Sequence, residues 1–235
     1  MPTYSFAEPV VATFVILPIA LLVLLLVGVL VAVRREGRSP VVAFVVTDTA
    51  AMLWMAATWA AASQGMFREW EATPPLFLLL VVGITVLAAW LALSSVGRAL
   101  AALPLWVLIV VQAFRLPLEI AMHELVGRGI MPVQMSYSGR NFDIITGASA
   151  LVVAALVRGG KARGLAWAWN VMGLLLVLNV ATVGIASTPR FRLFGDDNLN
   201  VFVTYPPFVW LPAVMVLAAL AGHLVIFRAL SRARD

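Results

Sequence analysis

Long apolar segments are the feature of this chain that most constrains its fold. Seven recur between short polar stretches, near residues 9–33, 41–63, 75–96, 104–126, 142–158, 165–187 and 207–229. A helix needs about 20 apolar residues to cross a hydrocarbon core about 30 Å thick, and only the fifth segment is clearly shorter. We expect the fifth helix to begin within the polar loop before it. The sequence therefore predicts an all-α integral membrane protein, a seven-transmembrane-helix bundle that forms a single domain over residues 1–235.

Composition excludes a soluble globular domain. The chain is 63% hydrophobic and 11% charged, whereas soluble domains are about 45–50% apolar and about 25% charged. It contains no cysteine, so disulfides, thiolate ligands and a cysteine nucleophile are excluded. The net charge of +5 is better explained by membrane orientation than by nucleic acid, because no basic patch alternates with exposed aromatic residues.

Lysine and arginine residues in the loops indicate how the bundle is oriented. With the N-terminus outside, the inner loops and the tail hold Arg34, Arg35, Arg38, Arg98, Arg158, Lys161, Arg163, Arg228, Arg232 and Arg234. The outer loops then hold only Arg68, Arg128, Arg140, Arg190 and Arg192. The positive-inside rule predicts an outer N-terminus and a cytoplasmic C-terminus. We expect the membrane to be a bacterial cytoplasmic (inner) membrane.

Four polar residues share one face of the fourth apolar segment. Gln112, Arg115, Glu119 and His123 follow one another by three or four residues, which is the spacing of neighbours on a helix surface. A charged side chain at the bilayer centre costs about 2.5–3.5 kcal/mol or more, so this row is a functional-site hypothesis. At about 1.5 Å per residue, Arg115 is expected near mid-membrane, Glu119 in the outer half and His123 near the outer surface.

The loop after this segment is expected to cover the same face. It contributes Gln134, Tyr137, Arg140, Asn141 and Asp143. Together with Arg115, Glu119 and His123 these residues would line an outward-facing ligand-binding pocket. Arg115 and Arg140 would receive an anionic or carbonyl group, and Glu119 or His123 would move a proton. The alternative is an Arg115–Glu119 ion pair, completed by Asp143 or His123, that only ties two helices together.

A metal or a cofactor has little support in the sequence. Glu119 and His123 have the spacing of two ligands to one metal ion, and Asp143 could supply a third. Arg115 on the same face would repel a cation, so we expect no metal and keep these three residues as weak candidates. No motif identifies a cofactor. A covalently bound retinal is excluded because the only lysine, Lys161, lies in an expected loop.

A smaller polar cluster is expected near the inner face. Asp48 lies about seven residues into the second segment, and His223 lies about 24 Å below the outer end of the last one, near the depth of Asn170. A buried Asp48–His223 pair could serve as a proton relay. The alternative is an interhelical hydrogen bond that fixes packing, worth about 0.6 kcal/mol on average in membranes.

Three classes of function remain open at this point. The leading one is binding or translocation of a small ligand, anionic or not, with or without coupled proton movement. The first alternative is a membrane-embedded enzyme that acts on a lipid-like or quinone-like substrate through Glu119, His123 and Asp143. The second is a non-catalytic structural subunit of a larger membrane complex. The expected partners are the lipid bilayer, a small-molecule ligand, and other membrane proteins or further copies of the chain, but no nucleic acid.

Overall fold

The computed structural model describes residues 8–35, 37, 39–160 and 162–232. Every regular element within these residues is helical, which confirms the prediction of an all-α membrane protein. Arg38, Lys161 and Arg234, three of the residues counted for orientation, lie outside the described residues. The α-helices are α1 (Pro9–Arg35), α2 (Pro40–Ser63), α3 (Leu76–Leu93), α4 (Ser95–Leu100), α5 (Leu105–Val111), α6 (Arg115–Gly127), α7 (Ile144–Arg158), α8 (Arg163–Ala186) and α9 (Leu217–Ser231).

Six of the described stretches are long and apolar enough to cross a membrane. They are α1, α2, α3, the joined α5 and α6, α8, and the last span Leu211–Ser231. The expected fifth span is α7, which has 15 residues and is about 22 Å long at 1.5 Å per residue. It does not extend into the preceding loop as expected, because it begins at Ile144. A count of seven spans therefore depends on α7.

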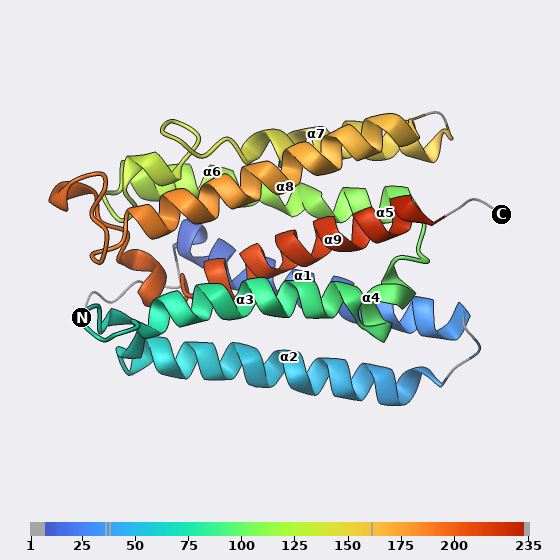
Figure 1. Cartoon of the computed structure of the whole chain (residues 1–235), viewed down its shortest axis with the longest axis horizontal. Coiled ribbons are helices and arrows are strands. Elements are labelled where there is room, and N and C mark those ends of the chain that lie inside the picture. The colour runs from blue at the N-terminus through green and yellow to red at the C-terminus, as the bar shows by residue number, and fades with distance from the viewer. Residues whose placement is uncertain (1–7, 36, 38, 161, 233–235) are drawn as a thin grey trace.

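The helices run side by side along the long axis of the bundle, with α9 between α3 and α8 (Figure 1). Helix α1 packs against α2 and α6, and α5 packs against α7. Helix α2 lies at the edge, and only Met55, Thr58 and Ala62 of its residues are buried. Helix α1 begins at one end of the bundle and α9 ends at the other (Figure 1).

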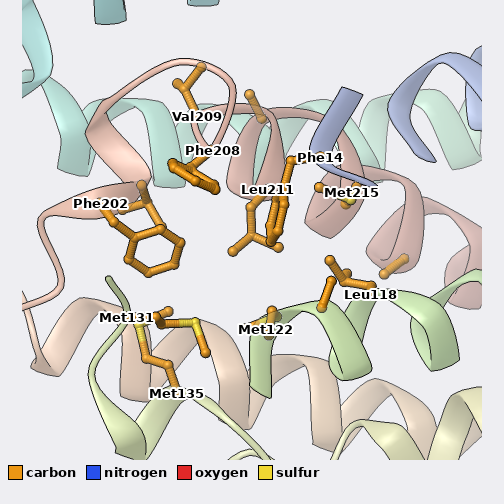
Figure 2. Close-up of a cluster of buried hydrophobic side chains, with 14 of the residues drawn as sticks. Phe14, Leu118, Met122, Met131, Met135, Phe202, Phe208, Val209, Leu211 and Met215 are labelled. Atoms are coloured by element: carbon orange, nitrogen blue, oxygen red, sulfur yellow. The ribbon is translucent and has the colours of Figure 1, made fainter. Parts of the chain in front are cut away.

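The main apolar core fills the end of the bundle where α1 begins. Figure 2 shows side chains from α1, from the last span and from the loop before it, facing those of α6 and the loop that follows it. The buried residues labelled there are Phe14, Leu118, Met122, Met131, Met135, Phe202, Phe208, Val209, Leu211 and Met215. This core fixes the position of α6 against the last span.

The fourth span is not one continuous α-helix. Helix α5 is followed by a 3₁₀ turn, Gln112–Phe114, and then by α6. Pro117 explains the change, because proline has no N–H to donate and its ring clashes with the carbonyl four residues earlier, that of Ala113. Gln112 is the first residue of the turn and Arg115 directly follows it, and both are buried.

The last span begins later than expected. Its first helical residue is Leu211 rather than a residue near 207, and Leu211–Val216 is a π-helical segment. Pro212 lies at its start and again removes one backbone donor. The shift of four residues moves His223 about 6 Å closer to the start of the helix than we predicted.

Helices α6 and α7 approach each other closely at Gly147. A Cβ atom at this position would overlap with the backbone nitrogen of Leu116 and would also meet the backbone of Arg115. Small residues allow such close approach between membrane helices. Gly147 therefore determines how near the start of α7 lies to Arg115.

We predict that Gly147→Ala destabilises the protein by about 1–3 kcal/mol, because the added methyl group forces the two backbones apart. The matched control is Gly83→Ala on α3, where an added Cβ atom would meet no other atom within 4 Å. Thermal unfolding of the purified protein in detergent, followed by tryptophan fluorescence, measures both effects. An equal loss of stability in the two variants would contradict the close contact between α6 and α7 at Gly147.

Candidate functional site

Arg115 is the centre of the candidate site. Its side chain is 1% exposed, and its Nη1 lies 3.0 Å from the Asp143 carboxylate. Nη1 also donates to the Gly173 carbonyl at 3.5 Å. No described residue accepts a hydrogen bond from Nε or Nη2. Because an unpaired buried donor costs about 1–3 kcal/mol, and more when it is charged, these two groups mark where a bound molecule would be stabilised.

Glu119 lies one turn further along α6 and is also 1% exposed. The Asn141 side-chain amide donates to both of its carboxylate oxygens, at 2.9 and 2.8 Å. The same amide donates to the Met135 carbonyl, and the Asn141 side-chain oxygen accepts from the Asp143 backbone N–H. Asn141 therefore links the Glu119 carboxylate to the backbone of Asp143 and holds the loop against α6.

The ion pair differs from the one that the sequence suggested. We considered Arg115–Glu119 within one helix, whereas Arg115 pairs with Asp143 between α6 and the start of α7. The close approach at Gly147 brings Asp143 over Arg115, while Asn141 occupies both oxygens of Glu119. Asp143 is thus the partner that closes the helix–helix contact.

A small cavity of about 20 Å³ lies beside these three charged residues. Arg115, Glu119 and Asp143 line it on one side, and apolar side chains of α8 and the last span line the other, among them Val177, Val180 and Met215. This volume is enough for about one water molecule. A larger ligand would require these apolar side chains to move.

His123 and Tyr137 form a separate pair at the surface. The two rings stack at a centroid distance of 4.4 Å, and the His123 Nδ1 lies 3.4 Å from the Ser138 hydroxyl. His123 is exposed and Tyr137 is half-buried. The structure therefore does not bring these two predicted pocket residues to Arg115.

Gln134 and Arg140 also lie apart from Arg115. Gln134 is buried, and its amide donates to the Ser187 hydroxyl at 2.9 Å and to the Asn198 carbonyl at 2.7 Å. Arg140 is exposed, with its guanidinium 5.3 Å from the Phe194 ring centroid. Both residues link the loop after α6 to the loop after α8.

The weak metal candidates do not converge. Among the described residues, no group of three or more histidine, aspartate or glutamate side chains could hold a metal ion. Glu119 is held by Asn141, Asp143 faces Arg115, and His123 stacks on Tyr137. The i, i+4 spacing of Glu119 and His123 was therefore not enough to form a ligand set.

His223 has a different partner from the one expected. Its Nδ1 lies 2.7 Å from the Asn170 side-chain oxygen, and the Asn170 amide donates to the His223 carbonyl at 3.1 Å. Asp48 is half-buried on the peripheral helix α2, and no described hydrogen bond joins it to His223. The structure therefore does not show an Asp48–His223 pair.

The Arg115 and His223 clusters meet at Gly173. The Gly173 carbonyl accepts from Arg115, and a Cβ atom on Gly173 would overlap with the His223 ring and with the Thr146 methyl group. Gly222 has a similar role, because a Cβ atom there would overlap with the Gln112 amide. The two clusters that the sequence placed at opposite ends of the membrane are therefore contiguous.

These glycines are the positions of the candidate site that sequence reasoning missed. Gly173 and Gly222 lie within long apolar helices, where glycine lowers helix stability. Each leaves space for a polar side chain from a neighbouring helix. The sequence did hold one signal for them: a glycine inside an apolar helix can leave space for a polar residue expected at a similar depth on another helix.

Comparison with protein-family models, with curated proteins and with solved structures finds no significant match for this chain. Functional inference therefore depends on the buried cluster itself. The cluster comprises Arg115, Glu119, Asn141 and Asp143 around the small cavity, extended through Gly173 to Asn170 and His223.

We predict that Asp143→Asn destabilises the protein by about 3–5 kcal/mol, because it leaves the Arg115 charge buried without its counter-charge. The matched control is Asp196→Asn, which removes an exposed ion pair with Arg192 of nearly the same length, 3.1 Å. That change should cost less than about 1 kcal/mol. Thermal unfolding in detergent compares them, and an equally small loss in both would show that Arg115 does not depend on Asp143.

Proposed function

We propose that this membrane protein binds a small anion at Arg115 together with a proton at Glu119, as the binding step of proton-coupled translocation. The observation that carries the proposal is the pair of unpartnered guanidinium donors, Nε and Nη2, on a fully buried arginine beside a cavity. A guanidinium is the side chain best suited to bind a carboxylate or phosphate through two parallel hydrogen bonds.

The balance of charge supports coupling to a proton. With both carboxylates ionised, Arg115, Asp143 and Glu119 sum to one negative charge, and a bound anion would add a second. Uncompensated charge is costly in a low-dielectric interior. A proton taken up with the anion cancels the added charge. Glu119 is the better acceptor, because Asp143 is paired with Arg115 while a neutral amide holds Glu119.

The extension of the cluster supports translocation over a static binding site. His223 is fully buried, and its Nε2 has no partner among the described residues. Its ring lies against Gly173, whose carbonyl accepts from Arg115. Polar groups therefore continue beyond Arg115 on the side away from Glu119, as a route for protons through membrane helices requires.

The arrangement of the bundle supports seven spans with the N-terminus outside, which we include in the proposal. Helices α1 and α9 begin and end at opposite ends of the bundle (Figure 1). Basic residues occupy the last turns of α1, α7 and α9, namely Arg34, Arg35, Arg158 and Arg228. This end would face the cytoplasm of a bacterial cell whose inner membrane holds the protein.

We predict that acetate binding takes up about one proton per anion in the wild-type protein and none in Glu119→Gln, since the amide cannot accept a proton. Titration calorimetry in buffers of different ionisation enthalpy measures this number. The matched control is Glu124→Gln, which makes the same change at an exposed position of α6 and should behave as wild type. Arg115→Gln should abolish acetate binding, and Arg128→Gln should not.

Two results would contradict the proposal. If folded Arg115→Gln binds acetate as well as wild type, Arg115 is not the anion site. If no small anion binds the wild-type protein and Arg115→Gln fails to assemble, the cluster is structural, as expected for a non-catalytic subunit. The enzyme alternative has less support, because His123 is exposed and stacks on Tyr137, whereas Glu119 is buried and held by Asn141.

A further inference from the structure

A second, apolar cavity lies between α3 and α8. Its volume is about 50 Å³. Val81 and Ile84 of α3 and Ala181 and Ile185 of α8 line it, together with Pro212 of the π-helical segment. The α9 helix continues from this segment between α3 and α8 (Figure 1). The cavity suits hydrocarbon rather than a hydrated ion.

The helices that form this cavity face lipid on either side of it. Leu79, Val82 and Val86 of α3 are exposed, as are Leu175 and Leu178 of α8. In a membrane-spanning bundle such apolar side chains contact acyl chains. The helices that wall the cavity are therefore ones that a molecule dissolved in the bilayer contacts without crossing water.

The apolar cavity and the Arg115 cavity share one wall. Val180, Leu211 and Val216 line both of them. These apolar side chains, from α8 and from the last span, therefore lie between a mainly apolar space and the cavity beside the two unpartnered guanidinium donors. Two of the three belong to the π-helical segment, a type of helix distortion that is frequent at functional sites.

We propose that the anion bound at Arg115 is the head of a membrane-dissolved amphiphile, whose hydrocarbon chain occupies the cavity between α3 and α8. This inference rests on the proposed function and assigns its substrate class. Movement of Val180, Leu211 and Val216 joins the two cavities into one site, with a charged end and an apolar end. The charged head then lies beside Arg115 and the hydrocarbon chain lies among apolar side chains. The ligand enters laterally from the bilayer.

A photoactivatable long-chain carboxylate tests the inference. Palmitate with a diazirine near the end of its chain is added to the protein in lipid nanodiscs and illuminated, and the labelled peptides are identified by mass spectrometry. We expect labels concentrated in residues 77–84, 180–185 and 211–216. Excess palmitate should compete for these sites, whereas hexadecanol, which lacks the charge, should not.

Bulky substitutions test the position of the chain. Val216→Trp fills the shared wall and should lower labelling about tenfold, the equivalent of about 1.4 kcal/mol of lost affinity. The matched control, Val82→Trp, places the same side chain on the lipid-facing side of α3 and should leave labelling unchanged. Ala181→Leu narrows the same cavity from α8, and gives a second measurement if Val216→Trp does not fold.

The outcomes separate this inference from the proposed function. Labels spread evenly over lipid-facing helices, or unchanged by both cavity-filling variants, would overturn the lateral site. Equal competition by hexadecanol would overturn the assignment of the head to Arg115. If acetate binding with proton uptake persists in either case, the proposed function stands and only the substrate class is wrong. If the localised labelling and the acetate binding with proton uptake are both absent, the substrate class and the proposed function are rejected together.

Discussion

The buried Arg115–Asp143 ion pair is the interaction on which the rest of the structure depends. A guanidinium inside a membrane protein needs a counter-charge and acceptors, because there is no water in the hydrocarbon region to provide them. Asp143 supplies the charge from the start of α7, and the Gly173 carbonyl supplies an acceptor from α8. One side chain on α6 therefore joins three helices, and the loop that carries Asn141 and Asp143 must fold over it.

Glycine and proline residues make room for this arrangement. Pro117 interrupts the fourth span just where Gln112 and Arg115 turn inward. Gly147, Gly173 and Gly222 each leave the space that a neighbouring backbone or polar side chain occupies. These residues lower the intrinsic stability of their helices. The compensating gain is the burial of a polar network that an uninterrupted apolar bundle could not accommodate.

The sequence predicted the class of the fold well, because each apolar segment can be recognised from its own hydropathy without knowledge of its neighbours. It also identified Arg115 and Glu119, because two charges in an apolar helix are conspicuous without knowledge of their neighbours. Partners were harder to predict. Asp143 replaced Glu119 as the ion-pair partner and Asn170 replaced Asp48 as the partner of His223, since both choices depend on which helices are adjacent.

The separation of the two polar clusters was mispredicted for a related reason. We placed His223 near the inner face by counting residues from 207, but the chain does not become helical until Leu211, where it then winds as a π-helix. A few residues of error along a helix amount to a full turn. An error of that size matters for whether His223 is assigned to a separate inner cluster or to the one that contains Arg115. Contacts across Gly173 resolve the question, and no single-helix argument could have done so.

The incomplete pairing of the cluster is what favours a functional site over a scaffold. A network that only ties helices together gains most when every donor and acceptor is satisfied, because partial satisfaction in a low dielectric is worse than an apolar contact. Here the Asn141 amide and the Glu119 carboxylate are well bonded. By contrast, Arg115 Nε and Nη2, Asp143 Oδ1, Gln112 Oε1 and His223 Nε2 have no hydrogen-bond partner among the described residues. Arg115 and Asp143 line the cavity, and most of the unsatisfied groups belong to the cluster that extends from Arg115 to His223. A binding site has this pattern because its ligand, or the water that replaces it, completes the hydrogen bonds that the protein leaves open.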